Sequence, residues 1–211
     1  MKIAFIGHGN VGGALADHLQ RLGHEVTLAA ADPSAESIRT LLGRNPALAV
    51  APPGEAVRRA EIVVLATPFH VNEGVLTPLS ADLRGKILID CTNPVGPGLS
   101  HGLGSTRSGT EMIQSLLPET KVVKAFSIYG YENFGHSKHP AGAVCPVMMF
   151  CGNDRAAKDT VAGLVAQMGW EPLDVGGAEQ ALHLEHMTLL WVRMVRMGGR
   201  SPHTVWAMLT R

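Results

Sequence analysis

The chain has few aromatic residues and little charge for its length. Aromatic residues make up 5% and charged residues 17% of its 211 residues. Lysine plus arginine and aspartate plus glutamate each number 18, so the formal net charge is zero. Such a chain has no net field with which to gather nucleic acid or an anionic membrane surface. We therefore expect neither of these as a partner.

Long apolar runs and cysteine pairs are also missing. No apolar run reaches the span of a bilayer, and no basic and apolar leader precedes the strand-like run that begins at Lys2. We therefore expect a cytoplasmic protein. Cys91, Cys145 and Cys151 lie in or beside apolar runs and lack the paired spacing of zinc or redox sites. We interpret them as small buried hydrophobic residues.

What the chain does contain is an alternation of short β-rich runs and helical patterns. This alternation predicts an α/β fold, a Rossmann-type doubly wound, mostly parallel sheet with helices on both faces. The expected strands are Lys2–Ile6, Glu25–Ala29, Glu61–Ala66, Lys86–Asp90, Lys121–Phe126, Val147–Phe150 and Glu171–Val175. The expected helices are Val11–Arg21, Ser34–Leu42, Gly54–Arg59, Asn72–Leu79, Gly109–Leu116, Asp154–Met168, Ala178–Met197 and Pro202–Leu209.

A glycine fingerprint joins the first expected strand to the first expected helix. In the run Gly7-His-Gly-Asn-Val-Gly12, the first glycine suits a tight turn and the last lets the helix pack closely on the strand. Gly9 lets the backbone approach a pyrophosphate, which the free N–H groups of a helix N-terminus attract. The sequence therefore predicts a dinucleotide site at Gly7, His8, Gly9, Asn10, Val11 and Gly12.

The last part of the chain is expected to add helices to this nucleotide-binding sheet. We divide the chain into a dinucleotide-binding domain, residues 1–177, and a C-terminal helical segment, residues 178–211. The segment carries more large apolar side chains than one face of a small domain usually needs, among them Leu190, Trp191 and Met194. We therefore expect these side chains to form a twofold interface in a homodimer.

Polar residues and prolines follow three of the expected strands. The tripeptides are Ala66-Thr67-Pro68, Thr92-Asn93-Pro94 and Ala125-Phe126-Ser127. In a doubly wound sheet the ligand lies over the carboxyl ends of the strands, so these residues form the floor of the site. Thr67, Asn93 and Ser127 offer hydroxyl or amide groups to ribose and nicotinamide. Phe126 and Tyr129 are candidates for the walls around a flat ring.

Taken in order, these motifs resemble the deazaflavin-dependent NADP oxidoreductases, also called NADPH-dependent F-420 reductases. The resemblance covers nearly the whole chain. It rests on Gly7–Gly12, the run from Gly85 to Val95 with Asp-Cys-Thr-Asn-Pro, Lys121–Phe126 followed by Tyr129 to Asn133, Cys151-Gly-Asn-Asp154, and Leu182-His-Leu-Glu185 through Trp191.

The resemblance implies hydride transfer between NADP or NAD and a bound deazaflavin, coenzyme F-420, or a flavin. It also implies a dimer assembled through the C-terminal helices. The cofactor contacts carried over are the glycine fingerprint, Ala31, Asp32, Ala66, Thr67, Pro68, Asn93, Pro94 and Phe126, with Ser127 and Tyr129 against the acceptor ring. Transfer between stacked rings needs orientation and no compulsory side-chain acid, which suits a chain without an evident acid–base set.

The chain departs from the family pattern after the second expected strand. The family typically places there an arginine that grips the adenosine 2′-phosphate, and this chain has Ala31 followed by Asp32. Asp32 is either a ribose-binding acid, as in NAD enzymes, or a cap on the helix expected from Ser34. Arg39 and Arg44 are alternative partners for a 2′-phosphate. In the family, an asparagine or histidine often follows the strand that corresponds to Lys121–Phe126, and this chain has Ser127 there.

Two other functions stay open. A pyrroline-carboxylate-type imine reductase shares the opening fingerprint, and Lys124, Tyr129 and His70 are its candidate proton donors. A nucleotide-sensing protein without turnover would keep the same fold. The ten histidines include two closely spaced pairs, His136 with His139 and His183 with His186, but neither pair has a recognisable third ligand. We therefore expect no metal site.

Overall fold

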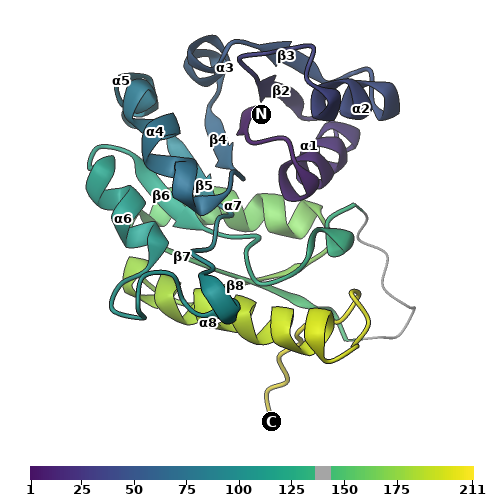
Figure 1. Ribbon diagram of the computed structural model, residues 1–211, viewed down its shortest axis with the longest axis vertical. Helices are drawn as coiled ribbons and strands as arrows, with labels where there is room; N and C mark the ends of the chain where they lie inside the picture. Colours follow the sequence, from purple (N-terminus) through teal and green to yellow (C-terminus); the bar gives the residue numbers. More distant parts are fainter. Residues whose placement is uncertain (136–143) are drawn as a thin grey trace.

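The computed structural model describes residues 1–135 and 144–211. Within these residues one eight-stranded sheet forms the centre of the molecule, in the order β3-β2-β1-β4-β5-β6-β7-β8 (Figure 1). Neighbours from β3 to β6 run parallel, β7 runs antiparallel to β6, and β8 runs parallel to β7. The strands are β1 (Lys2–Ile6), β2 (Glu25–Ala29), β3 (Ala49–Ala51), β4 (Ile62–Leu65), β5 (Ile87–Asp90), β6 (Lys121–Lys124), β7 (Val147–Gly152) and β8 (Glu171–Asp174).

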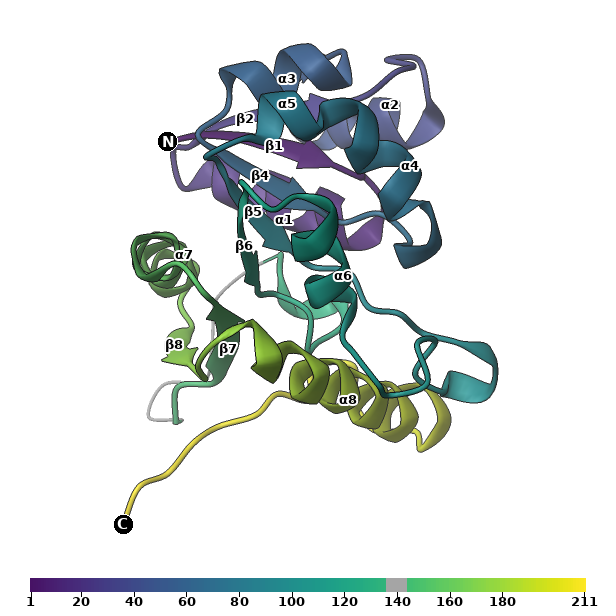
Figure 2. The ribbon, with the colours of Figure 1, turned by 90° about the vertical axis from the view of Figure 1, so that its left-hand side faces the viewer.

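Helices cover both faces of this sheet, as the alternating pattern predicts (Figure 2). The α-helices are α1 (Asn10–Arg21), α2 (Glu36–Arg44), α3 (Pro53–Arg59), α4 (Asn72–Leu76), α5 (Ser80–Leu83), α6 (Gly109–Leu116), α7 (Arg155–Gln167) and α8 (Ala181–Val192). Apolar residues of α1, α2, α7 and α8 pack in one cluster with the sheet, and those of α3, α4, α5 and α6 pack in another. The Rossmann-type, mostly parallel fold is confirmed.

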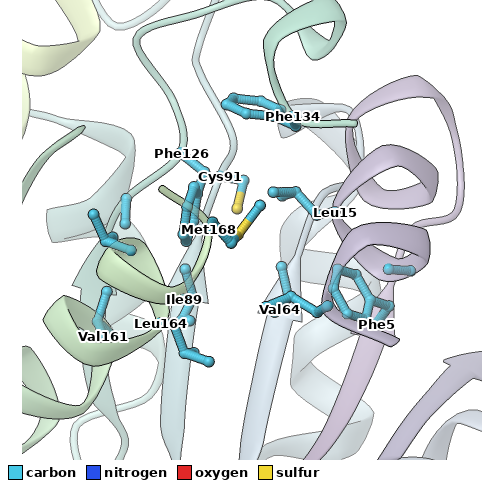
Figure 3. Close-up of a cluster of buried hydrophobic side chains, with 14 of the residues drawn as sticks. Phe5, Leu15, Val64, Ile89, Cys91, Phe126, Phe134, Val161, Leu164 and Met168 are labelled. Carbon is cyan, nitrogen blue, oxygen red and sulfur yellow. The ribbon is translucent and has the colours of Figure 1, made fainter. Parts of the chain in front are cut away.

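The larger apolar cluster fixes the strand ends that carry the candidate site. Figure 3 shows Phe5, Val64 and Ile89 of β1, β4 and β5 facing Leu15 of α1 and Leu164 of α7. All five side chains are buried. Because this interior holds adjacent strands at a fixed register, the loops after those strands meet along one edge of the sheet.

The chain after α8 differs from the sequence expectation. Residues 202–209 were expected to be helical, and this prediction is wrong. The indole N–H of Trp191 donates to the Thr204 carbonyl (2.7 Å), the Val147 N–H donates to the Trp206 carbonyl (3.0 Å), and the Trp206 N–H donates to the Tyr129 hydroxyl (3.0 Å). The Thr204 and Trp206 carbonyls and the Trp206 N–H are therefore bonded to distant parts of the chain, whereas a helix would bond them to residues four positions away.

Two further expectations are corrected. Trp191 was expected in a dimer interface, but its side chain is buried inside its own chain, with the Arg196 guanidinium 5.4 Å from the ring centre. Cys145 is exposed, whereas Cys91 and Cys151 are buried as expected.

The three-residue strand β3 was not anticipated from the sequence, since three residues are too few to show a periodic pattern. Within the described residues, none of the helices has the length and apolar character needed to traverse a bilayer.

Candidate functional site

The glycine fingerprint forms the turn from β1 to α1. Gly7 has a positive φ of 96°, and a Cβ there would lie 2.6 Å from the Ala66 carbonyl carbon. A Cβ at Gly12 would collide with the carbonyl oxygen of Gly7. Both positions therefore require glycine in order to bring strand and helix together.

Position 9 differs from positions 7 and 12, because the protein's own atoms leave room there for a larger side chain and glycine is needed only if a ligand binds. A Cβ on Gly9 would meet no described atom within 4 Å. Gly9 is also the residue before α1, whose first turn has no side-chain cap in the described chain. The uncapped N–H groups and the helix dipole favour a phosphate group, so the open space at Gly9 fits the pyrophosphate of a dinucleotide.

The structure brings together the polar residues that follow β5 and β6. The Asn93 amide donates to the Ser127 carbonyl oxygen (3.1 Å), and Thr188 Oγ1 of α8 lies 2.9 Å from that same oxygen. The hydroxyl of Ser127 is buried and has no hydrogen-bond partner among the described residues. Thr67 follows β4 and is half-buried, with its hydroxyl bonded to Asn72. The residues after these three strands thus lie at one edge of the sheet, with Asn93 and Thr67 bonded to other protein groups and the Ser127 hydroxyl buried.

The two candidate ring-wall residues are buried. Phe126 adopts a positive φ of 53°, which turns the chain sharply after β6, and its ring meets that of Phe134 edge-on at 6.1 Å. Tyr129 stacks on Trp170 at 5.0 Å, and its hydroxyl donates to the Val147 carbonyl (2.7 Å). Burial raises the pKa of the Tyr129 hydroxyl. The structure therefore places Tyr129 in the core beside β7 rather than at the strand ends.

A cluster of buried charges lies behind these strand ends. Lys124 Nζ is 3.5 Å from Asp90 Oδ2 and 3.2 Å from Glu185 Oε1, and all three side chains are inaccessible to solvent. Burial alone would lower the pKa of Lys124, but attraction to Asp90 and Glu185 outweighs it, so the pKa is raised. Lys124 is therefore held as a cation in the interior and is not placed to donate a proton to a substrate.

His101 and the start of α6 complete this cluster. His101 Nδ1 accepts from the backbone N–H groups of Leu103 (3.3 Å) and Ser105 (3.2 Å), so Nε2 carries the proton that is donated to Glu185 Oε2 (2.7 Å). The imidazole is then neutral, and the cluster holds two carboxylates against one ammonium. The N–H of Gly109 (2.9 Å to Glu185) and the hydroxyl of Thr110 (2.7 Å to Asp90) stabilise the excess negative charge.

The residues predicted to contact the adenosine lie between β2 and α2. Ala31 is exposed, and Asp32 Oδ1 accepts from the N–H and the hydroxyl of Ser34 (2.8 and 2.6 Å). These bonds lower the pKa of Asp32, which therefore carries its charge in a turn before α2. The residue before α2 is Ala35, and no side chain caps the helix. Asp32 thus braces the preceding turn rather than α2 itself.

A hollow of about 390 Å³ lies between the first turns of α1 and α2. His8 Nδ1 and Ser37 Oγ are 2.7 Å apart in its wall, and burial lowers the pKa of His8. Arg44 also lines this hollow, whereas Arg39 does not. Of the two arginines considered for a 2′-phosphate, Arg44 is therefore the one that faces the glycine turn.

The histidine pairs do not build a metal centre in the described residues, where no group of three suitable ligands occurs. His186 Nε2 lies 3.0 Å from Ser105 Oγ and meets the His101 ring edge-on. His136 and His139 lie outside the described residues.

Sequence reasoning missed the roles of Asp90 and His101 and did not place Lys124 and Glu185 beside them. One signal was available in the strands. Asp90 and Lys124 are the charged last residues of two buried strands, and the sheet register makes them direct neighbours. Because isolated buried charges are rare, two charges at matching positions indicate an ion pair. His101 lies in a glycine-rich loop and carried no such signal.

Comparison with known proteins agrees with this geometry. Residues 2–94 match the family model described as NADP oxidoreductase, coenzyme F420-dependent. The metalloreductase STEAP3 of Rattus norvegicus is 31% identical over 189 residues, which cover 89% of this chain and 36% of the rat protein. The F420-dependent NADP reductase of Methanocaldococcus jannaschii is 29% identical over 148 residues, or 65% of this chain and 63% of the reductase. The chain thus spans about a third of the rat protein and under two thirds of the archaeal one.

A solved structure matches over the whole length. The crystal structure of a candidate F420-dependent NADP reductase from Arthrobacter sp. FB24 is 30% identical to this chain, with a TM-score of 0.89 and coverage of 100% of both chains. Sequence, fold and the open glycine turn therefore agree, and the chain belongs to the coenzyme F420-dependent NADP oxidoreductase family, whose members are NAD(P)-dependent oxidoreductases.

Proposed function

We propose that this protein transfers a hydride between NAD(P)H and the ring of a bound deazaflavin, coenzyme F420, with a flavin as the alternative acceptor. The observation that carries the proposal is the open space at Gly9 against the uncapped first turn of α1, in a chain whose family is named for NADP and F420. When bound, F420 supplies a flat ring that takes up a hydride without help from a side-chain acid.

The chain's own residues supply binding and orientation. The backbone at Gly9 and the first turn of α1 hold the pyrophosphate, while the groups after β4, β5 and β6 hold the nicotinamide half. Asn93 is held in place for this by its bond to the Ser127 carbonyl. Correct orientation of two rings is the main requirement for hydride transfer between them.

The buried positions of two candidate proton donors also support this choice over an imine reductase. Reduction of an imine needs a proton donor at the substrate nitrogen. Lys124 is enclosed by Asp90 and Glu185, and the Tyr129 hydroxyl is bonded to the Val147 carbonyl. Of the three side chains considered for this role, His70 alone is exposed.

We also propose that the protein acts as a homodimer. Leu190 and Met197, on α8 and the turn after it, are 51% and 70% exposed, and the partly buried Met194 lies between them in sequence. Large apolar side chains gathered at one end of a helix favour contact with a second apolar surface. A second copy of the chain offers the same surface, which a twofold axis would bring together.

The test is an absorbance assay with purified protein and NADPH or NADH. Separate reactions contain F420, FMN, FAD or a cyclic imine. The proposal expects nucleotide-dependent loss of the oxidised F420 or flavin absorbance and no consumption of nucleotide with the imine. Turnover of the imine alone would identify a reductase of another class. Nucleotide binding without turnover of any acceptor would identify a sensor.

A further inference from the structure

A directed hydrogen-bond chain runs from the buried charges to Thr67, the partly exposed residue just after β4. Thr67 Oγ1 donates to Asn72 Oδ1 (2.7 Å), Asn72 Nδ2 donates to Thr92 Oγ1 (3.0 Å), and Thr92 Oγ1 donates to Asp90 Oδ1 (2.7 Å). Asn72, Thr92 and Asp90 are 3%, 4% and 0% exposed, whereas Thr67 is half-buried at the end of β4. This hydrogen-bond chain therefore has a buried end at Asp90 and a partly exposed end at Thr67.

The direction of these bonds is fixed from the buried end. Asp90 Oδ1 accepts from the backbone N–H of Thr92 (2.9 Å), and Asp90 Oδ2 accepts from the Thr110 hydroxyl (2.7 Å) beside the Lys124 ammonium, so both oxygens of Asp90 are acceptors. Thr92 has a single hydroxyl proton, which it gives to this carboxylate. The Thr92 oxygen must then receive its second bond from a donor, and the donor on Asn72 is the amide nitrogen.

The same reasoning reaches Thr67. With the nitrogen of Asn72 turned to Thr92, its carbonyl oxygen faces Thr67, and that oxygen only accepts. Thr67 must therefore donate its hydroxyl proton inward to Asn72. The Thr67 oxygen keeps its two lone pairs and has no second proton, so Thr67 can accept a hydrogen bond from a ligand but cannot donate one.

We propose that the chain from Asp90 through Thr92 and Asn72 sets Thr67 as a dedicated acceptor, which selects an N–H or O–H donor on the nicotinamide half of the dinucleotide. This rests on the proposed function. Thr67 follows β4, the first strand of the sheet half that holds the nicotinamide side in doubly wound folds. The donors available there are the carboxamide amino group and the ribose hydroxyls.

The hydrogen-bond chain also makes Thr67 strict in requiring a hydrogen-bond donor on the ligand. A free threonine could rotate its hydroxyl and satisfy either a donor or an acceptor on the ligand. Thr67 could do so only by breaking its bond to Asn72, which would leave a buried amide oxygen without a donor. A site built in this way rejects analogues that lack the matching group more strongly than a flexible hydroxyl does.

Calorimetric titration of the full chain with nucleotide analogues tests the proposal. The analogues are the 3-acetylpyridine dinucleotide, which replaces the carboxamide amino group by methyl, and dinucleotides whose nicotinamide ribose lacks one hydroxyl. Wild-type protein should bind one of these about tenfold more weakly than the parent nucleotide, and the affected analogue identifies the donor. Thr67→Val should bind the parent about tenfold more weakly and lose the discrimination, whereas Thr67→Ser should keep both.

Asn72→Leu separates the role of the chain from that of Thr67 alone. With its proton released, Thr67 can meet a donor or an acceptor, so this variant should bind the parent within a few-fold of wild type and bind the disfavoured analogue nearly as well. Thermal melting establishes that each variant is folded. The inference is overturned if Thr67→Val binds parent and analogues as wild type does, or if Asn72→Leu keeps the full discrimination. A wild-type protein that binds no dinucleotide would overturn the proposed function as well.

Discussion

Asp90 and Lys124 end the neighbouring strands β5 and β6 and are register partners in the sheet, with Oδ2 and Nζ 3.5 Å apart and both side chains fully buried. The pair is bonded to the residues after β5, since the Thr92 hydroxyl accepts from Asn72 and the Thr92 carbonyl accepts from Lys124 Nζ (2.8 Å). The ion cluster and the site therefore share one hydrogen-bonded network.

Removal of the buried ammonium should destabilise the protein strongly. Lys124→Met leaves two buried carboxylates without their cation, and breaking a buried pair in this way costs about 3–5 kcal/mol. Urea unfolding at neutral pH measures the loss. Lys121→Met is the matched control, because Lys121 is on the same strand, is 41% exposed and pairs with Asp154 at 3.5 Å. That control should change the free energy of unfolding by less than about 1 kcal/mol.

The same lysine predicts a pH dependence. Its pKa is raised in the folded protein, so its stabilising contribution is complete below the ordinary lysine pKa of about 10.4 and is lost as the pH rises through the folded value. Wild type should therefore lose stability between pH 10 and more alkaline solution by more than Lys124→Met does. If the free energy of unfolding falls with rising pH equally in the two proteins, Lys124 is not the titrating group.

Gly9→Ala should abolish dinucleotide binding and leave the fold intact. A methyl group at this position meets no described protein atom within 4 Å, but it occupies the space assigned to the pyrophosphate. Calorimetry measures binding, and thermal melting measures stability. Gly12→Ala is the contrasting variant, because its Cβ would collide with the Gly7 carbonyl and should lower the melting temperature. A folded Gly9→Ala protein with unchanged affinity would remove the pyrophosphate from this turn.

Nucleotide preference should be weak. Ala31 offers no cation to a 2′-phosphate, and the Asp32 carboxylate repels one. NADH should therefore bind comparably to NADPH. Ala31→Arg with Asp32→Ser should shift the preference toward NADPH by about one to two orders of magnitude, because a charge-assisted contact contributes about 1.5–3 kcal/mol. Dissociation constants at one salt concentration test this.

If the protein instead prefers NADPH, the structure offers one arginine that could bind the 2′-phosphate. A wild-type preference for NADPH above about a hundredfold, equivalent to about 2.7 kcal/mol, would mean that another cation holds the phosphate. Arg44 lines the hollow beside His8 and Ser37 and would be the residue to replace next.

The dimer proposal predicts that Leu190→Glu sediments as a monomer. A charge at an exposed apolar position should disrupt an interface and leave the chain's own core intact, unlike a change at the buried Trp191. Leu22→Glu is the control, because Leu22 is also exposed and follows α1 at another part of the molecule. Wild-type protein that sediments as a monomer at micromolar concentration would contradict the proposal.

Patterns with strong local causes were predictable from the sequence. The glycine turn could be read because its steric requirements are local, and the strand-end residues could be read because parallel strands end at a common edge. Two features depended on distant partners. Trp191 is buried because the chain after α8 turns back and offers the Thr204 carbonyl. The directed bonds from Asp90 to Thr67 join four residues from a strand, a helix and two loops. No local pattern contains such contacts.

Direct transfer of a labelled hydride tests the central claim. Protein is incubated with F420 and NADPH carrying deuterium at the transferable position of the nicotinamide, and the reduced deazaflavin is analysed by mass spectrometry. The account predicts one deuterium on the deazaflavin ring, because the two rings exchange the hydride without passing it through solvent. The label is placed on one face of the nicotinamide and then, in a second sample, on the other. Reduced deazaflavin that carries no deuterium in both samples would contradict the account, and so would no reduction by a protein that binds NADPH.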